Sequence, residues 1–284
     1  MPTLTTPVPS TPYLTVAELK RSPIYTQLQK LVPGGSQADN DAELGRIIMR
    51  VSAMINGETR QNLAATVDIE ADWATFSDHG DLRIHTRGNP IIQVVSVLIG
   101  PEPYNLTAIS DLTHVELDPW QITIPAFAVS NVGPWGYRSR RRVWAQWTYV
   151  TGYPVTTLAS AVVAGATSLT VDDATGVVAG QTQLTIEDGK WLETVVPTVV
   201  AGNTLTVAPL AFAHQAGVGV SALPGDITEA ALLLISRLHD SWSLSMGAVT
   251  HDGSGARKPK GGSGSGARAL CDAGVILAPY KRVW

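Results

Sequence analysis

The sequence has a single cysteine, Cys271, in 284 residues, so it forms neither an intramolecular disulfide nor a cysteine-rich zinc site. It also lacks an apolar run long enough to span a bilayer, and its first residues lack the basic and apolar regions of a signal peptide. Charged residues make up only 15% of the chain, and the net charge of −4 gives no strong basic field for nucleic acid. These absences predict a soluble protein made in a reducing cytoplasm, with no membrane partner.

The sequence also lacks the common motifs of enzyme active sites. The six histidines are scattered, and there is no Gly-x-Ser-x-Gly motif, phosphate-binding glycine loop or Cys-x-x-Cys pair. Asp188 and Glu193 could act as paired carboxylates, but Asp188 begins an Asp-Gly dipeptide that is typical of a hairpin turn. One face of a predicted strand carries three acidic residues, Asp68, Glu70 and Asp72. Because no fourth ligand accompanies them, a solvated face is favoured over a cation site. We expect no enzyme activity, cofactor or metal.

The best-defined helix is predicted at 226–246. Asp226 is a suitable N-cap, and Glu229 stands three positions on, where it could reach back to the cap amide. The apolar residues that follow cover most sides of the helix, which indicates that several neighbours bury it. We therefore expect this segment to be the central helix of the main domain.

Three further helices are expected, at about 15–32, 40–61 and 267–275. The first opens with a capping box, Thr15 to Glu18, and should kink or restart at Pro23. The second begins near Asn40, with Glu43 at its third position. Two segments are expected to lack helix and strand: a Pro/Thr-rich arm at 1–13, either unstructured or laid along a neighbouring subunit, and a flexible Gly/Ser-rich loop at 247–266.

Between the predicted helices, apolar residues recur at about every second position, which is typical of β-strands. Residues 63–150 contain several alternating segments, and Ile91–Ile99 is a β-branched run predicted to be buried on both faces. The charge-poor stretch 158–222 has short strands separated by turns, which predicts a small antiparallel β sandwich or barrel inserted before the central helix. The predicted fold is α+β: a helical-bundle core formed by 1–157 and 223–284, with a β-rich insertion after its second helix, and the separate insert 158–222.

Two basic segments are candidates for binding. The first follows Gly133–Gly136 and contains four arginines: Arg138, Arg140, Arg141 and Arg142. It could contact phosphates of a passing nucleic acid, or form a solvated hairpin tip or a salt bridge between subunits. The second is the apolar, aromatic and basic stretch 277–284, which either folds back on its own domain or docks on a partner.

Several short motifs together resemble one known family. They are Tyr13-Leu-Thr-Val-Ala-Glu-Leu, Asp41-Ala-Glu-Leu-x-Arg-Ile-Ile, Tyr149-x-x-Gly-Tyr-Pro, Leu223-Pro-Gly-Asp-Ile-Thr-Glu-Ala and Leu277-Ala-Pro-Tyr-Lys-Arg. In this order they resemble the head–tail adaptor (connector) proteins of long-tailed double-stranded DNA bacteriophages. The likeness covers about half of the chain. The stretches 63–135 and 159–222 are larger than a minimal helical adaptor needs, and the resemblance assigns them no role.

The resemblance implies a structural protein of the virion neck, present in the host cytoplasm during assembly. Adaptors of this family form a ring, typically a dodecamer, under the portal and extend the DNA channel towards the tail. The implied partners are other copies of the chain, the portal, a tail-side neck protein, and double-stranded DNA that passes through the lumen without sequence readout. Five C-terminal residues would dock on the portal: Leu277, Tyr280, Lys281, Arg282 and Trp284.

An alternative function remains open. The chain could be a neck or tail decoration, or an adhesin, whose insert binds carbohydrate. Trp191, beside the polar residues Asp188–Lys190, is the residue that this alternative favours.

Overall fold

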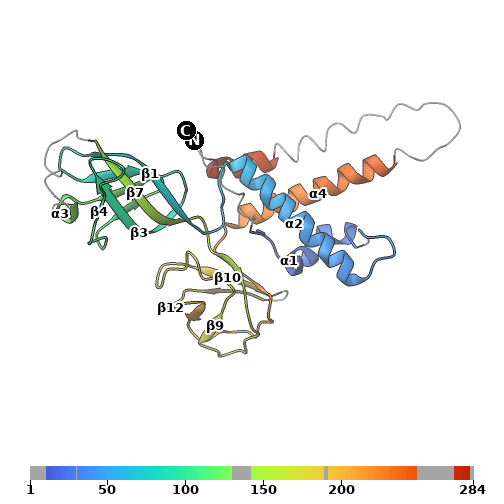
Figure 1. The fold of residues 1–284 in the computed structure, drawn as a ribbon. Coiled ribbons are helices and arrows are strands. Elements are labelled where there is room, and N and C mark those ends of the chain that lie inside the picture. The colour runs from blue at the N-terminus through green and yellow to red at the C-terminus, as the bar shows by residue number, and fades with distance from the viewer. Residues whose placement is uncertain (1–10, 30, 130–141, 189–190, 248–271, 282–284) are drawn as a thin grey trace, which may run out of the picture.

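The computed structural model describes residues 11–29, 31–129, 142–188, 191–247 and 272–281. These residues form three parts, which Figure 1 shows as a group of helices, a large curled sheet and a smaller β structure next to the point where the first two meet. Each part has its own hydrophobic core. The predicted α+β class is confirmed.

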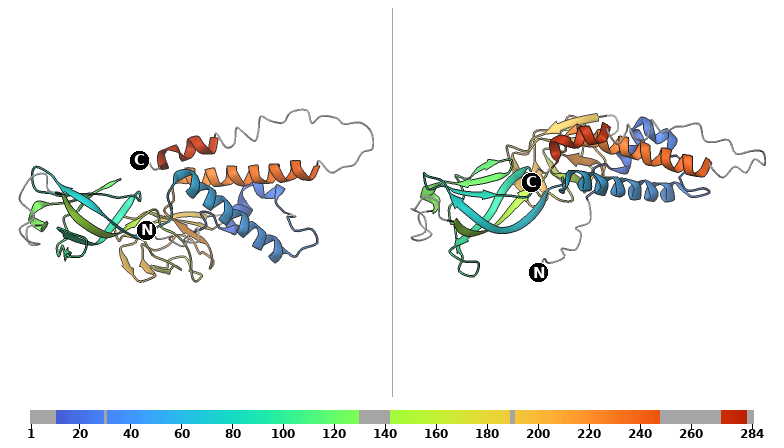
Figure 2. Two further views of the ribbon diagram at one scale, coloured as in Figure 1. Left: turned by 45° about the horizontal axis from the view of Figure 1, so that its top comes forward. Right: turned by 90° about the horizontal axis from the view of Figure 1, so that it is seen from above.

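The helical part draws its elements from both ends of the chain. They are α1 (Val16–Arg21), the 3₁₀ helix η1 (Pro23–Gln27), α2 (Gln37–Thr59), α4 (Gly225–Gly247), a helical turn at 272–277 and the 3₁₀ helix η4 (Ala278–Tyr280). The two long helices, α2 and α4, contact each other, and both views of Figure 2 place the C-terminal helix along them. No helix among the described residues is long and apolar enough to cross a membrane.

The starts of the first two helices differ partly from prediction. The capping box of Thr15 and Glu18 is present, and a new helix does begin at Pro23, but η1 ends at Gln27 instead of continuing to 32. The expected start of α2 near Asn40 is wrong. Ser36 and Asp39 form the capping box instead, so α2 begins three residues earlier.

The predicted N-cap of the central helix is also wrong. Because α4 begins at Gly225, Asp226 lies in its first turn, and its carboxylate accepts a bond from the Tyr280 hydroxyl. The predicted helix at 267–275 is described only from 272, where the structure is helical to 277. The predicted flexible loop, apart from Gly247 at the end of α4, lies outside the described residues.

The sheet part is a seven-stranded antiparallel sheet in the order β4-β3-β7-β1-β2-β6-β5. Its strands are β1 (Thr66–Phe76), β2 (Leu82–His85), β3 (Ile91–Gly100), β4 (Thr107–Ala108), β5 (Glu116–Asp118), β6 (Gln121–Ile124) and β7 (Arg142–Thr151), with a short helix α3 (Ala126–Val129). The sheet is curled (Figure 1), and its hydrophobic core includes Trp147 and Tyr149. The expectation that Ile91–Ile99 is buried on both faces is wrong: burial roughly alternates along β3, and Val95 is exposed.

The insert consists of a four-stranded and a three-stranded antiparallel sheet, in the orders β11-β10-β14-β8 and β12-β13-β9. The strands are β8 (Val155–Thr157), β9 (Ser168–Thr170), β10 (Leu184–Asp188), β11 (Trp191–Val195), β12 (Val199–Ala201), β13 (Thr204–Thr206) and β14 (Gly219–Ser221). Since β8 pairs with β14, the β structure of the insert begins at Val155, before the expected boundary at 158.

Candidate interaction sites

The C-terminal segment is anchored on the helical part. Leu277 is buried in the core formed by the helices. The Tyr280 hydroxyl donates to both carboxylate oxygens of Asp226, at 2.8 Å each, and the Gln61 side-chain amide donates to the Tyr280 carbonyl at 2.9 Å. Lys281 forms an ion pair with Glu58 on α2. Residues 272–281 therefore fold back on their own chain.

The two remaining candidates for portal docking, Arg282 and Trp284, lie outside the described residues. Burial, followed by the nearby charge of Asp226, raises the pKa of the Tyr280 phenol further above its usual value of 10.0, so it remains a hydrogen-bond donor. The acceptor of this bond, the Asp226 carboxylate, lies in the first turn of α4.

The arginine segment is described only at its end. Arg142 is the first residue of β7 and is exposed, whereas Arg138, Arg140 and Arg141 lie outside the described residues. Contact of this segment with DNA or with a second subunit therefore stays a prediction.

The motif at 149–154 joins the sheet part to the helical part. The N–H of Gly152, which has a φ of +95°, donates to the Pro90 carbonyl at 2.9 Å, and the N–H of Tyr153 donates to the Leu63 carbonyl at 2.7 Å. A Cβ on Gly152 would lie 2.5 Å from the Ala64 carbonyl oxygen. Glycine therefore allows the close backbone contact that links β7 to the segment before β1.

Tyr149, at the start of this motif, holds Glu70 of β1. Its hydroxyl donates to Glu70 Oε1 at 2.6 Å and accepts a bond from the Gly88 N–H, while Glu70 also accepts from the Arg87 N–H. Burial raises the pKa of Glu70, although these bonds oppose the shift. The predicted solvated acidic face is thus wrong at Glu70, since this carboxylate faces the same side as buried residues of β7.

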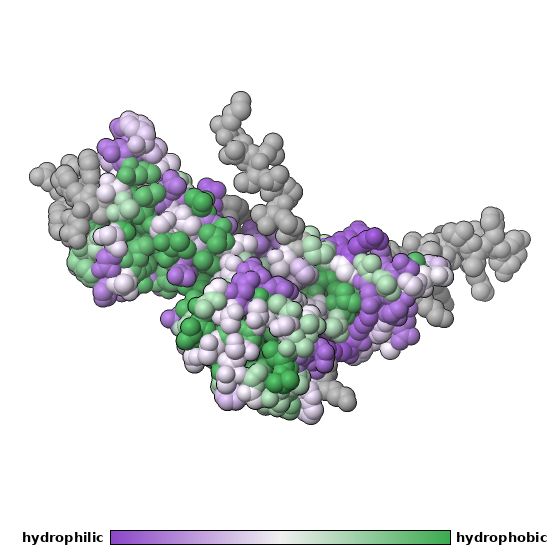
Figure 3. Space-filling view, turned by 60° about the horizontal axis from the view of Figure 1, so that its bottom comes forward, coloured by the Kyte–Doolittle hydropathy of each residue, from purple (hydrophilic) through white to green (hydrophobic). Residues whose placement is uncertain are grey.

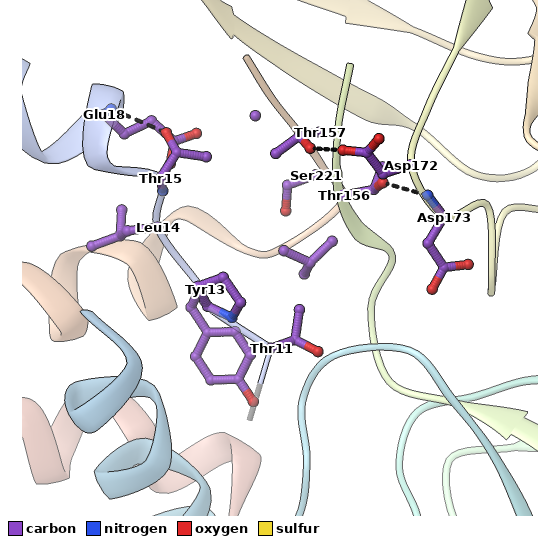
Figure 4. Close-up of a pocket in the computed structure, with 13 residues that line it drawn as sticks. Thr11, Tyr13, Leu14, Thr15, Glu18, Thr156, Thr157, Asp172, Asp173 and Ser221 are labelled. Atoms are coloured by element: carbon purple, nitrogen blue, oxygen red, sulfur yellow. Dashed lines mark hydrogen bonds between the residues drawn. The ribbon is translucent and has the colours of Figure 1, made fainter. Parts of the chain in front are cut away.

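A cavity of about 230 Å³ lies between the helical part and the insert (Figure 4). One wall contains the segment Thr11–Thr15 and Glu18, and the other contains hydroxyl and carboxyl groups of the insert: Thr156, Thr157, Asp172, Asp173 and Ser221. Burial raises the pKa of Glu18, whose carboxylate accepts the Thr15 N–H. Because a Cβ on Gly219 would lie 2.3 Å from Glu18 Oε1, the glycine makes room for this contact between the two parts.

Sequence reasoning missed a buried histidine site in the insert. The His214 side chain is fully buried, with Nε2 3.0 Å from Glu193 Oε2 and Nδ1 3.6 Å from Asp188 Oδ2. Arg21 of α1 reaches this site, since its guanidinium lies 3.6 Å from Asp188 and donates to the Glu187 carbonyl. The site therefore supports the insert and its contact with the helical part. In the described part of the chain, no three His, Cys, Asp or Glu residues are arranged to hold a metal ion.

Trp191, the residue considered for carbohydrate binding, is 47% exposed. Its ring stacks on Phe212 with centroids 4.2 Å apart and planes 7° apart, so one face of the indole is covered. The neighbouring Asp188 carboxylate accepts the Gln215 N–H and pairs with Arg21. One polar group that a sugar could use is thus already bound within the chain.

No protein-family model and no curated protein matches the chain. Among solved structures, it is similar to a chain of "Neck of empty GTA particle computed with C6 symmetry", at 14% identity and a TM-score of 0.37, over 95% of this chain and 94% of that one. It is also similar to a chain of "Virion of native gene transfer agent (GTA) particle", at 15% identity and a TM-score of 0.33, with the same coverage.

Proposed function

We propose that this chain is a structural, non-enzymatic protein of a phage-like virion, and specifically the head–tail adaptor that forms a ring under the portal. The observation that carries the proposal is the anchored C-terminal segment. Leu277 and Tyr280 hold this segment on the helical part, and in the sequence it is followed directly by the basic and aromatic residues Arg282 and Trp284. An aromatic and basic tail held in this way is suited to dock in a pocket of a partner.

Exposed apolar side chains support assembly with other copies. Figure 3 shows apolar surface over both the sheet part and the insert, and Phe127 and Leu192 are 57% and 67% exposed. Monomeric proteins rarely expose large apolar patches, whereas subunits of an assembly bury them against neighbours. In the proposed ring, copies pack side by side, the portal and a tail-side neck protein bind at opposite ends, and DNA passes through without sequence readout. The dodecamer remains an expectation from the family resemblance.

The experiment is to measure the mass of the purified full chain, alone and with its cognate portal ring, by mass photometry. We expect a complex with the portal whose affinity falls tenfold or more in Trp284→Ala, because truncating an aromatic anchor typically costs about 2 kcal/mol or more. Trp191→Ala is the matched control and should bind the portal normally. Deletion of 277–284 is less informative, since Leu277 belongs to the helical core.

Two outcomes would contradict the proposal. One is a full chain that stays monomeric and ignores the portal over the whole concentration range. The other is binding of a glycan by the full chain that Trp191→Ala removes and Trp284→Ala leaves intact, which would favour the carbohydrate-binding alternative.

A further inference from the structure

Strand β1 has an open edge. It pairs with β7 from Thr66 to Thr75, but with β2 only at Thr75 and Phe76. Over residues 66–74 the edge that faces away from β7 therefore has no strand partner in the described part of the chain. An edge of this length presents a row of backbone donors and acceptors, which proteins normally cover or pair.

One hydrogen bond shows which residues direct their backbone groups to this edge. The Trp73 N–H donates to the side chain of its neighbour Asp72, at 2.7 Å, instead of entering the ladder with β7. Because hydrogen-bonding direction alternates along a strand, the odd-numbered residues of β1 face the open edge with their backbone groups. The N–H of Trp73 is bonded locally, so the N–H groups at positions 67, 69 and 71 are the ones directed to a partner.

A groove of about 740 Å³ adjoins the first half of this edge. Its lining includes residues 65–70, Gln61 and Asn62 after α2, Arg87 and Gly88 after β2, and Asp173 and Thr175 of the insert. All three parts of the chain thus contribute to the groove, which lies where they meet in Figure 1. An extended segment that entered the groove would lie alongside β1.

The two faces of β1 differ in character. On one face Val67, Ile69 and Trp73 are 56%, 67% and 47% exposed. On the other face Asp68 and Glu70 line the groove. Side chains of an added strand lie opposite those of β1 on the same face, where apolar pairs and pairs of opposite charge are stabilising. A strand that fits this edge therefore has apolar side chains at alternate positions and basic ones between them.

The charge of the groove also favours a basic partner. Its lining contains one guanidinium and three carboxylates: Arg87, Asp68, Glu70 and Asp173. Among the described residues the Asp68 carboxylate has no hydrogen-bonding or ionic partner, and burial raises its pKa. A lysine or arginine placed beside it would favour the charged carboxylate and oppose this shift.

The described edge strands of this chain do not supply such a segment. They are β4, β5, β8, β9, β11 and β12, and none of them contains a lysine or an arginine. Strand β5 instead carries Glu116 and Asp118. The sequence of residues 1–10 has no basic residue either, and three of its residues are prolines, which have no N–H. The required charge and hydrogen bonds therefore favour a segment of a different protein.

We propose that the open edge of β1 binds an extended segment of a different protein by strand addition, and that apolar and basic side chains alternate along this segment. Its backbone pairs with residues 67, 69 and 71. Its apolar side chains cover Val67 and Ile69, and a basic side chain pairs with Asp68. In this mode of recognition the main-chain hydrogen bonds provide affinity, and the alternating side chains provide selectivity. The site does not depend on ring formation or on the portal.

A synthetic peptide of about nine residues, in which valine and lysine alternate, is the probe for the full chain. At saturating peptide we expect the amides of residues 67, 69 and 71 to exchange at least about tenfold more slowly, because they gain hydrogen-bond partners. The amides that join β1 to β7 provide the internal reference and should change little. Unchanged exchange at the three amides would overturn the proposal.

A control peptide and a matched pair of variants test the charge requirement. The control peptide has glutamate in place of each lysine and should bind at least about tenfold more weakly. Asp68→Asn should weaken binding of the lysine peptide about fivefold, because it removes one ion pair. Asp118→Asn, on the exposed strand β5 at the end of the sheet, should leave the affinity unchanged. Equal binding of the two peptides, or equal effects of the two substitutions, would contradict the proposed partner chemistry.

Hydrogen exchange without peptide distinguishes the other occupants of this edge. We expect the amides of residues 67, 69 and 71 to exchange rapidly in the full chain at every protein concentration. Slow exchange at all concentrations would show that another segment of the same chain covers the edge. Slow exchange that appears only as the concentration rises would show that a second copy does. Either result would refute the assignment to a different protein.

Discussion

The hydroxyl of Tyr280 joins the C-terminal segment to the first turn of α4. Because it donates to the charged Asp226 carboxylate, Tyr280→Phe should lower the free energy of unfolding by about 1.5–3 kcal/mol, the range for hydrogen bonds to charged groups. Chemical denaturation measures the change. Tyr104→Phe is the control, since Tyr104 is 83% exposed and should give a change close to zero. Equal stability of the two variants would contradict the role of this bond as an anchor.

Glu18 should give part of the chain's stability a pH dependence. Burial raises its native pKa above the ordinary value of 4.5, with the Thr15 hydrogen bonds opposing the shift. The native state therefore binds the proton more tightly than the unfolded state, and stability falls as pH rises from below 4.5 through the native pKa. Glu18→Gln keeps a side chain suited to a capping box but cannot titrate.

We expect the unfolding free energy of Glu18→Gln, relative to the parent chain, to rise between pH 4 and pH 7. Urea denaturation at several pH values measures this difference. Parallel pH profiles for the two proteins would show that Glu18 has the same affinity for its proton in the folded and unfolded states, contrary to the burial seen here.

Single residues could be predicted where their partners are close in sequence. Thr15 and Glu18 were identified as a capping box because both members stand within one helical turn. The box at Ser36 was missed because Asp39 occupies the position where glutamate is the usual signal. The role of His214 could not be predicted, because its partners Asp188 and Glu193 lie more than 20 residues away, on β10 and β11. They meet His214 only in the folded insert.

At the scale of elements, the turn between β7 and β8 depends on Gly152. Gly152→Ala should destabilise the chain by about 3 kcal/mol or more, because the positive φ and the clash with the Ala64 carbonyl oxygen add together. Gly165→Ala is the matched control, with a φ of +82° and no atom within 4 Å of the added Cβ. It should lose only about 1–2 kcal/mol, for the backbone conformation alone. Thermal unfolding of both variants measures the difference, and similar losses would contradict the steric role of the Ala64 contact.

Strand positions were largely predictable, but their burial was not. The alternating segments at β1, β2 and β7 identify half-buried strands because the side-chain period is a local property. The β-branched run of β3 suggested burial on both faces, yet Gln93 and Val95 are exposed, and the pairing with β7 shifts register between Val94 and Ser96, where Val95 lies. Whether a strand face is covered depends on which distant segment packs there, and a single strand's sequence does not contain that information.

At the scale of the molecule, the chain consists of three cores joined by narrow contacts, and the boundary of the insert follows from its strand pairing. Residues 158–222 looked self-contained in composition, but β8 supplies an edge strand to the sheet, with Thr156 opposite Val220. The Pro154 carbonyl also accepts the Ala222 N–H. A composition change therefore marked the insert approximately, whereas hydrogen-bond pairing defines where its structure begins.

This pairing leads to a prediction about fragments. A fragment of residues 153–223 should unfold cooperatively, because it retains all four strands of the larger sheet and the core that contains Leu158, Leu184 and Val220. The fragment 158–222 lacks β8, exposes the free edge of β14 and loses its ladder, so it should have a clearly lower melting temperature or fail to fold. Circular dichroism and amide NMR dispersion compare the two. Equal stability would mean that β8 belongs to the linker instead, and that the insert's contact with the helical part through Arg21 and Glu18 is what keeps this strand in place.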